Sequence, residues 1–218
     1  MYDIVVFGPQ GSGKGTQSEI LAKKLHIPAV SVGQLWREEI AKKTELGVQA
    51  ESVVATGGLV SPELTTQIVY NRMMKGDATE GLILDGYPRF LAQLESHDKI
   101  LNSLGRELTD AILLEVSDDV SVARLAGRRS CTNAACGANF HVEFQPPITE
   151  GICDRCGAPI AQREDDVPDA IRRRLGLYHK ETEPLAKVYE ERGILRPIDG
   201  SQSIENVAQQ IARLLDLP

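Results

Sequence analysis

A continuous apolar run followed at once by a glycine-rich stretch constrains the fold of this chain more than any other feature. Residues 4–7, IVVF, are β-branched and aromatic, which is typical of a strand buried on both faces of a sheet. The glycines of the next stretch, GPQGSGKGT at 8–16, let backbone N–H groups curl around a phosphate without Cβ clashes. A helix is expected at its end, and the helix N-terminus adds partial positive charge. The pattern therefore predicts a strand, a phosphate-binding loop and a helix.

Lys14 gives this loop its chemical character, because a lysine at this spacing reaches the β- and γ-phosphates of a nucleotide. The hydroxyl that usually follows the lysine directly is replaced by Gly15 and comes one residue later, as Thr16. The alternative is a glycine-rich turn that binds nothing. The strand, the glycine spacing and the lysine together favour the phosphate-binding interpretation.

Strands and helices alternate along the rest of the chain. Further strands are expected at 29–30, 82–84, 111–116 and 194–198, and helices at 16–25, at 117–128 with Ser117-Asp118 as its cap, and at 203–217. A long helix over 167–192 should be interrupted at Pro184. Residues 32–74 should be helical in pieces, broken at Gly47, at 57–58 and at 61–62, where Ser61 caps a helix that Pro62 opens. The alternation predicts an α/β fold whose parallel five-stranded sheet has helices on both sides.

Two stretches interrupt this alternation and are expected to be insertions into one core. The first covers about 31–61. The second, 129–162, loses helical periodicity and is rich in Cys, Gly and Pro.

The acidic charge balance argues against some classes of partner. Lys and Arg number 24 against 31 Asp and Glu, so the net charge of −7 disfavours a general nucleic-acid or membrane-surface binder. A hydrophobic content of 42% and a charged content of 25% indicate an ordinary globular protein. The first residues form no positively charged leader, and no window approaches the roughly 18 apolar residues of a membrane span. A cytoplasmic protein with no membrane and no nucleic-acid partner is expected.

A carboxylate ends one of the predicted strands. Asp85 follows 82–84 and can hold Mg²⁺ through water if the phosphate loop lies beside it, the alternative being a cap for the next helix. The residues that follow, Gly86-Tyr87-Pro88-Arg89, predict a stiff turn that presents a guanidinium to the same cleft.

Arginines are the next candidates, since phosphoryl transfer needs positive charge and bidentate donors around the transferring group. Any single arginine is more often a solvated surface residue, so composition does not select among them. The candidates are Arg37, Arg89, Arg124, Arg128, Arg163 and Arg174.

All four cysteines lie within one short part of the chain, as Cys131-x4-Cys136-x16-Cys153-x2-Cys156. Both pairs have spacings found in tetrahedral metal sites. In a reducing compartment the cluster favours a structural Zn²⁺ over disulfides, although four thiolates also accept iron or cobalt. The alternative is free thiols. His141 is a candidate substitute ligand, or a residue that forms hydrogen bonds within the same segment.

Five separated motifs together resemble the adenylate kinase family in its long-lid bacterial form. The first four are GPQGSGKGTQ at 8–17, SVGQLWREEI at 31–40, LILDGYPR at 82–89 with Gln93 beyond it, and GRR at 127–129. The fifth is a run that contains CG at 136–137, FH at 140–141, QREDD at 162–166 and RRRL at 172–175. The resemblance extends to the C-terminal helix. It implies the fold of phosphate-loop nucleoside-phosphate kinases, with a core of 1–30, 62–124 and 164–218, a mobile AMP-binding insertion at 31–61, and a mobile lid at 125–163 that closes over ATP.

The resemblance implies an enzyme that transfers a phosphoryl group reversibly from Mg-ATP to AMP, giving two ADP, and that acts as a monomer in adenine nucleotide homeostasis. It implies that the ATP phosphates, ribose and base are bound by Gly11, Ser12, Gly13, Lys14, Gly15, Thr16, Arg124, Arg128, Asn139, Phe140 and Gln202. It implies that AMP is bound by Val32, Arg37, Gly58, Leu59, Val60, Gly86, Tyr87, Pro88, Arg89, Gln93, Arg163 and Arg174. The implied catalytic residues are Lys14, Asp85, Arg89, Arg128, Arg163 and Arg174.

Some positions depart from the family pattern. Val32 replaces a threonine, Gln34 an aspartate, Trp36 a small aliphatic residue and Phe90 a threonine, and the first cysteine pair encloses four residues instead of two. The lost hydroxyl at Val32 removes a polar contact to AMP worth about 1 kcal/mol. These changes bear on base selectivity, whereas the phosphate-binding arginines are retained.

Three other functions are alternatives to this one. The first is a kinase for another nucleoside monophosphate, which a comparison of AMP, GMP, CMP and UMP separates. The second is a switch or motor NTPase, for which the sequence offers no partner-facing switch region. The third is a zinc-knuckle nucleic-acid binder, but residues 133–152 contain no Lys or Arg and two glutamates, which disfavours binding to a phosphate backbone.

Overall fold

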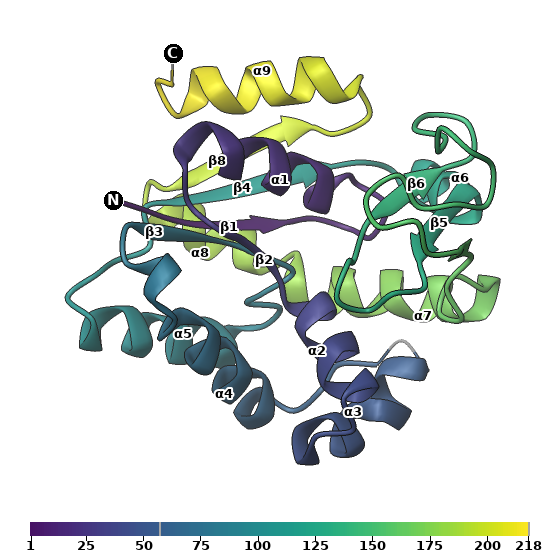
Figure 1. Ribbon diagram of the computed structural model, residues 1–218. Coiled ribbons are helices and arrows are strands. Elements are labelled where there is room, and N and C mark those ends of the chain that lie inside the picture. Colours follow the sequence, from purple (N-terminus) through teal and green to yellow (C-terminus); the bar gives the residue numbers. More distant parts are fainter. Residues whose placement is uncertain (57, 218) are drawn as a thin grey trace.

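The apolar run near the start of the chain is the central strand of a parallel sheet in the computed structural model, which describes residues 1–56 and 58–217. The strand order is β2-β3-β1-β4-β8, and every pairing is parallel (Figure 1). The predicted five-stranded α/β fold is confirmed. Its strands are β1 (Tyr2–Phe7), β2 (Ala29–Ser31), β3 (Gly81–Asp85), β4 (Asp110–Glu115) and β8 (Leu195–Asp199).

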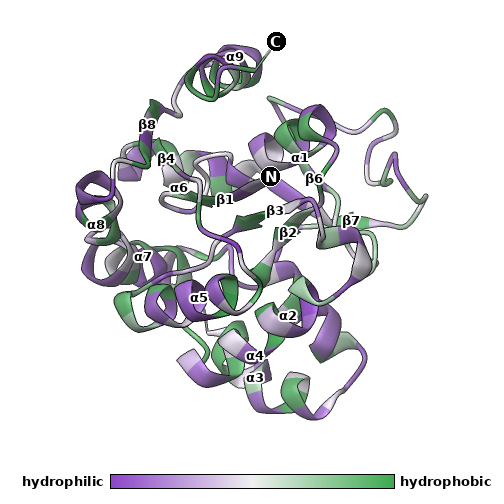
Figure 2. Cartoon of the chain, turned by 90° about the vertical axis from the view of Figure 1, so that its left-hand side faces the viewer, coloured by the Kyte–Doolittle hydropathy of each residue, from purple (hydrophilic) through white to green (hydrophobic). Residues whose placement is uncertain are grey.

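Successive residues of β1 contact two separate hydrophobic cores, as expected for a strand buried on both faces. Ile4 and Val6 pack with α1 (Lys14–Leu25) and α9 (Ile204–Leu214). Val5 and Phe7 pack on the opposite face, with helices that include α4 (Pro62–Met73), α5 (Leu91–Ser103) and α8 (Leu185–Glu191) (Figure 1). Figure 2 shows β1 and β3 in hydrophobic colours between helices of mixed hydropathy. Each side chain buried in this way contributes about 1.5–3 kcal/mol, so the strand that carries the glycine-rich loop is firmly held.

The predicted break at Gly47 is wrong. Helices α2 (Val32–Ala41) and α3 (Glu45–Ala55) are separated at 42–44, and Thr44 caps α3 by accepting a hydrogen bond from the Gly47 N–H at 3.1 Å. A Cβ at Gly47 would lie 2.2 Å from the Glu39 carbonyl oxygen. The glycine is therefore needed for close packing of the two helices, which sequence alone does not distinguish from a helix break.

The break at 61–62 is confirmed, and its cap is as predicted. Ser61 Oγ accepts from the Leu64 N–H at 3.3 Å, and Pro62 is the first residue of α4. The other predicted break, at 57–58, includes Gly57, which lies outside the described residues.

The long helix predicted over 167–192 is two helices. α7 (Pro168–Leu177) passes into a π-helical segment at Tyr178–Thr182, and α8 begins after Pro184. The predicted interruption at Pro184 is confirmed, because the helical conformation stops at Thr182 and resumes at Leu185. In the core, the sequence also did not predict α5 or the short 3₁₀ turn at Gly76–Ala78.

The Cys-rich segment, in which no helix was predicted, forms a second, three-stranded antiparallel sheet. It follows α6 (Asp118–Gly127), whose predicted cap is confirmed because Ser117 Oγ accepts from the Val120 N–H at 3.3 Å. The sheet has the order β6-β5-β7, from β5 (Arg128–Cys131), β6 (Asn139–His141) and β7 (Ile160–Ala161). None of the helices in 1–56 and 58–217 is long and apolar enough to cross a membrane.

Candidate active site

The glycine-rich loop joins the carboxyl end of β1 to the N-terminus of α1. Gly11 and Gly13 have φ angles of 80° and 96°, a region that favours glycine, and Gly13 is the N-cap of α1. A Cβ at Gly11 would also lie 2.9 Å from the Ser121 carbonyl oxygen. The helix starts at Lys14, two residues earlier than predicted. The loop therefore has the backbone conformation and the helix N-terminus that bind phosphate.

Lys14 lies across this loop, where its Nζ donates to the carbonyl oxygens of Gly8 at 2.9 Å and Pro9 at 2.7 Å. Burial lowers the pKa of Lys14 to about 8, and nearby arginines add to this effect while Asp85 opposes it. An anion in the loop would stabilise the charged ammonium.

The loop opens into a cleft of about 790 Å³, a volume typical of small-molecule sites. Asp85 lies on its wall at the end of β3, and the strand register places it beside Val6 of β1 and Ser31 of β2. An ideal Cβ on Gly15 would come within 3.6 Å of Asp85 Oδ2. The carboxylate thus faces the first turn of α1, as the sequence predicted for a group that holds Mg²⁺ through water.

The turn after Asp85 holds Arg89 by several hydrogen bonds. Arg89 Nε donates to the Gly86 carbonyl at 3.0 Å, and its main-chain N–H donates to Gln93 Oε1 at 2.8 Å. The Arg89 carbonyl accepts from Thr182 Oγ1, in the π-helical segment, at 2.8 Å. The main chain of Arg89 is therefore held by α5 and the π-helical segment, and its guanidinium by the carbonyl of Gly86.

Positive charge converges on this cleft from several elements. Burial lowers the pKa of Arg37, Arg89, Arg163 and Arg174, and neighbouring guanidinium groups lower it further. Asp165 partly opposes the effect at all four arginines. Cations held together out of water in this way favour a bound polyanion. The cationic side chains that line the cleft with Lys14 are Arg37, Arg89, Arg124, Arg128, Arg155, Arg163 and Arg174.

Two aspartates at the start of the Arg-rich helix orient two of these arginines. Asp166, whose side chain has no exposed surface, accepts from Arg128 Nε at 2.8 Å and lies 3.7 Å from Arg174 Nη1. Asp165 accepts from Arg174 Nη1 at 2.7 Å. The motif analysis did not assign these aspartates a role. The signal that could have found them is the acidic pair in QREDD just before RRRL, since buried guanidinium groups need carboxylate partners.

Arg163 connects the cleft to the second sheet. Its Nε donates to Ser130 Oγ on β5 at 2.6 Å, and its Nη2 donates to Asn139 Oδ1 on β6. Asn139 also accepts from Ser130 at 2.8 Å, so the three side chains form one network. Phe140, next to Asn139, is nine-tenths buried in the small core of this sheet and lines the cleft.

Arg124 lies on the side of the cleft formed by the phosphate loop and the segment after β8. Its Nη1 donates to the carbonyl oxygens of Gly11 at 3.3 Å and Gly200 at 2.9 Å. Gln202 follows on the same segment and accepts from Gln210 Nε2 at 2.8 Å. Both side chains line the cleft.

A smaller cavity of about 80 Å³ adjoins the cleft on the α2–α3 side. It brings together predicted AMP-binding residues from four parts of the chain, namely Val32, Arg37, Gly58, Leu59, Val60, Gly86, Arg89, Gln93 and Arg174. Trp36 lines it as well, and packs into the main core with 4% of its surface exposed. Phe90 is the N-cap residue of α5.

Tyr87 is the one predicted nucleotide-binding residue that lines neither cavity. Its side chain is fully buried beneath the turn, where its hydroxyl donates to the Gln93 carbonyl at 3.2 Å. The structure therefore corrects the prediction, because Tyr87 supports the turn from below. The motif could not show this, since neighbouring residues of a turn point in different directions.

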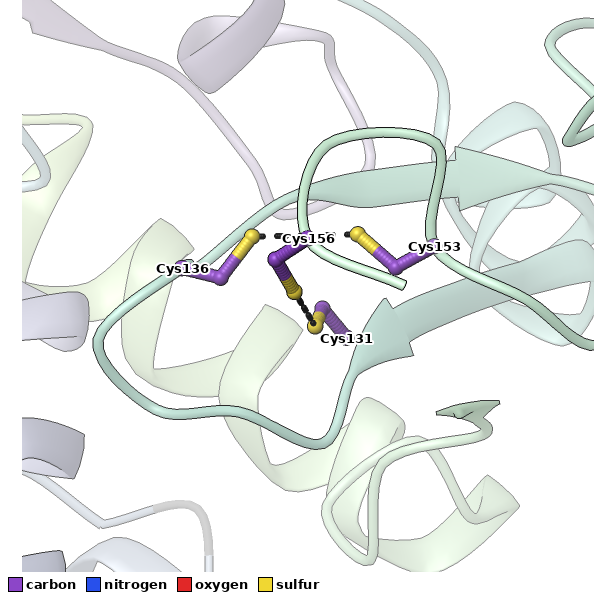
Figure 3. A group of neighbouring side chains, drawn as sticks. All are labelled: Cys131, Cys136, Cys153 and Cys156. Atoms are coloured by element: carbon purple, nitrogen blue, oxygen red, sulfur yellow. Dashed lines mark hydrogen bonds between the residues drawn. The ribbon is translucent and has the colours of Figure 1, made fainter. Parts of the chain in front are cut away.

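The four cysteines converge at one point of the second sheet (Figure 3). All four sulfur atoms lie within 4.8 Å of one another, with Cys131 Sγ 3.4 Å from Cys156 Sγ and Cys136 Sγ 3.7 Å from Cys153 Sγ. Tetrahedral Zn–S bonds of 2.3 Å place sulfurs about 3.8 Å apart, so the donor set fits such an ion. Burial raises the pKa of Cys153, but the N–H groups of Arg155 and Cys156 outweigh it and lower that pKa to about 7.

His141 is not part of this group. Its Nδ1 accepts from the N–H groups of Glu143 at 3.1 Å and Phe144 at 3.2 Å, and its ring stacks on that of Phe144. Of its two predicted roles, hydrogen bonding within the segment is therefore confirmed.

The fold and the cleft together define a class of protein. The sheet and its helices have the fold of phosphate-loop nucleoside-phosphate kinases. The site combines a phosphate loop, a carboxylate on the neighbouring strand and arginines from both sides of the cleft, which suits phosphoryl transfer between two phosphate-bearing molecules.

Comparison with known proteins identifies the family. A family model described as adenylate kinase matches residues 6–194. A protein named adenylate kinase from Pelobacter propionicus is 42% identical over 98% of this chain and 96% of its own length. An adenylate kinase from Caldicellulosiruptor bescii is 40% identical over 98% of this chain and 99% of its own length. One from Clostridium acetobutylicum is 41% identical over 97% of this chain and 98% of its own length. The chain belongs to the adenylate kinase family.

Proposed function

We propose that this chain transfers the γ-phosphoryl group of Mg-ATP reversibly to AMP, giving two ADP, in the cleft described above. Membership of the adenylate kinase family supports the reaction. The single observation that supports the site is the convergence of Lys14 and buried arginines on the phosphate loop. The bond from the γ-phosphorus to the β-phosphate oxygen breaks, and a bond to an AMP phosphate oxygen forms. Because that acceptor is already ionised, the reaction needs positive charge and alignment and no general base.

The donor side is assigned to the phosphate loop and its neighbours. Residues 11–16 would hold the ATP phosphates, Arg128 would reach them from the start of β5, and Arg124 and Gln202 would flank the base with Asn139 and Phe140. These residues border one connected cleft, which supports the assignment.

The acceptor side is assigned to the smaller cavity and the turn after β3. Arg37 and Arg89 would bind the AMP phosphate, with Val32, Gln93 and residues 58–60 around the base. Arg163 and Arg174 would bridge the two phosphate groups. The fixed position of Arg89 supports this assignment, since a guanidinium held by its own turn is aligned before the substrate binds.

Asp85 would hold Mg²⁺ through water, and the ion, when bound, would neutralise charge on the ATP phosphates. Mg²⁺ prefers oxygen ligands and keeps several waters, which suits a lone carboxylate beside the phosphate loop. Proton transfer plays no part, so the carboxylate acts by charge and position alone.

We also propose that the chain moves as three parts, with a core of 1–30, 62–124 and 164–218, an AMP-binding insertion of 31–61 and a lid of 125–163. The lid forms its own sheet, and the insertion contributes α2 and α3, which supports treating each as a unit. All side chains assigned to the site come from one chain, which supports a monomer.

The four cysteines are proposed to hold a structural Zn²⁺, with iron or cobalt as alternative occupants. Four thiolates complete a tetrahedral shell, so no position remains for substrate or water. The buried apolar cluster of the lid contains only Cys131, Ala138, Phe140 and Cys153 among the described residues. A segment with so small a core needs a further constraint to hold its shape. Reduced thiolates also fit a cytoplasmic protein.

The reaction is tested by its stoichiometry. Purified protein is incubated with ATP, AMP and Mg²⁺, and the nucleotides are separated by ion-exchange chromatography. Two ADP should form for each ATP consumed, and ADP alone should yield equal amounts of ATP and AMP. One ADP and one free phosphate per ATP would instead indicate an ATPase and contradict the proposal.

A further inference from the structure

Gln34 connects two segments that lie 100 residues apart in the sequence. It lies in α2, and its Nε2 donates a hydrogen bond to the carbonyl oxygen of Ala134. Ala134 belongs to the turn between Cys131 and Cys136, so the contact joins the first insertion to the Cys-rich sheet. Gly137 lies against the same amide, since a Cβ there would be 2.9 Å from the Gln34 side-chain carbonyl carbon.

The other end of the same amide holds an arginine. Gln34 Oε1 accepts from Arg37 Nε at 3.1 Å and from Arg37 Nη2 at 3.0 Å. Gln34 Nε2 also donates to Glu38 Oε1 at 3.3 Å. A guanidinium only donates, and a carbonyl or carboxylate only accepts, so these partners fix which way the amide points.

The turn that presents Ala134 is held by its own hydrogen bonds. The Asn133 carbonyl accepts from Cys136 N–H at 3.0 Å and Gly137 N–H at 3.3 Å, and Asn133 Oδ1 accepts from Ala135 N–H at 3.1 Å. These bonds leave the Ala134 carbonyl pointing out of the turn toward α2. The four residues between the first two cysteines therefore form a rigid acceptor for Gln34.

Only an amide can serve both partners here without adding charge. A carboxylate would accept from Arg37, but it has no hydrogen to donate to Ala134 and would place negative charge against that carbonyl. Glutamine at this position, where the family pattern has an aspartate, therefore suits a contact with a backbone carbonyl.

We propose that Gln34 is a positioning residue that couples closure of the Cys-rich lid to the orientation of Arg37 at the phosphate of AMP. The proposal rests on the function given above, which assigns Arg37 to AMP and the lid to ATP. Lid closure forms the bond to Ala134, which fixes the amide and with it the guanidinium. Because coupling between two binding sites is reciprocal, ATP should tighten AMP binding and AMP should tighten ATP binding through this residue.

The test is the effect of a bound ATP analogue on AMP affinity. AMP is titrated calorimetrically into the full-length, metal-loaded protein, with and without a saturating ATP analogue that cannot transfer its phosphoryl group. The coupling factor is the ratio of the two dissociation constants. Gln34→Glu and Gln34→Met should each reduce this factor roughly fivefold, the equivalent of one neutral hydrogen bond. The melting temperature should stay near that of the wild type, because the side chain is only partly buried.

Gln49→Glu is the matched control. Gln49 is exposed on α3, in the same insertion, and the substitution makes the same change in charge away from the lid. Its coupling factor should equal that of the wild type. An unchanged factor in both Gln34 variants, or an equal loss in Gln49→Glu, overturns the role of Gln34 while leaving the proposed reaction intact. A wild-type protein that binds no AMP and forms no ADP overturns the proposed function itself.

Discussion

Asp166→Asn tests whether the buried carboxylate orients the arginines of the cleft. The Asp166 side chain has no exposed surface, and the side chains of its partners Arg128 and Arg174 are 19% and 14% exposed. Asparagine has the same shape, but it turns one acceptor oxygen into a donor that faces a guanidinium. Arg128 would then lose its carboxylate partner, whereas Arg174 would keep Asp165 at 2.7 Å.

The expected cost follows from this burial. Breaking a buried ion pair by removing one partner costs about 3–5 kcal/mol, and the partial exposure of the arginines favours the lower end. For a chain of this length, about 3 kcal/mol corresponds to a melting temperature lower by roughly 6–12 °C. Loss of one donor to a transition state typically reduces kcat by about 10²–10³. Since both guanidinium groups remain and are only misaligned, kcat should fall by about tenfold or more.

Asp3→Asn is the matched control, because it also breaks a buried ion pair but near the amino end of β1, away from the cleft at the carboxyl end. Asp3 accepts from Arg106 Nε at 2.7 Å, and both side chains are less than a tenth exposed. Melting is followed by circular dichroism, and turnover is measured at least 20 °C below both melting temperatures. Both variants should melt earlier, and only Asp166→Asn should lose activity. Wild-type kcat in Asp166→Asn would refute the assigned orienting role.

Four further outcomes are expected. Lys14→Met should lower kcat by about 10²–10³ without lowering the melting temperature, because it removes a buried charge; near-normal turnover would contradict the loop assignment. Arg89→Ala should weaken AMP binding and turnover but leave ATP affinity nearly intact, as measured by calorimetry. An equal loss of ATP affinity would contradict the assignment of Arg89 to AMP. Removing the metal from the four cysteines with a strong chelator, in excess Mg²⁺, should lower the melting temperature and leave some activity at low temperature. Less than one metal ion per chain by elemental analysis, together with an unchanged melting temperature after chelation, would count against the metal site. Burial lowers the pKa of His97 to about 4, so the unfolded chain takes up a proton first as pH falls, and stability should decrease between about pH 6.5 and pH 4. Between those pH values, the free energy of unfolding measured with denaturant should fall by up to about 3 kcal/mol less in His97→Phe than in the wild type. An unchanged pH dependence would show that His97 is not the group responsible.

The sheet and the phosphate loop could be predicted because their signals are local. Residues 4–7 are apolar at every position, as a strand with two cores requires, and Gly8, Gly11 and Gly13 of the loop have the positive φ angles that their residue type favours. The caps at Ser61 and Ser117 depend on a hydroxyl three residues before an N–H, which is also a local pattern. Features of this kind are specified by neighbouring residues.

The errors have a different origin, because they depend on contacts between distant segments. Gly47 is required by the approach of α3 to Glu39, which a single helix pattern does not contain. The side chain of Tyr87 turns into the core although the residues on both sides of it line the cleft. The partnership of Asp166 with Arg128 spans 38 positions, and that of Gln34 with Ala134 spans 100. The sequence named the arginines as candidates but could not show what holds them.

The proposed reaction depends on which nucleotide accepts the phosphoryl group, and this is measured by comparing acceptors under identical conditions. ATP and Mg²⁺ are kept saturating, and kcat/KM is measured for AMP, GMP, CMP and UMP in a coupled assay for ADP. The kcat/KM for AMP should exceed that for each of the other acceptors by about tenfold or more, since one good base contact is worth about 1.4 kcal/mol. Equal or higher kcat/KM for another nucleoside monophosphate would contradict it.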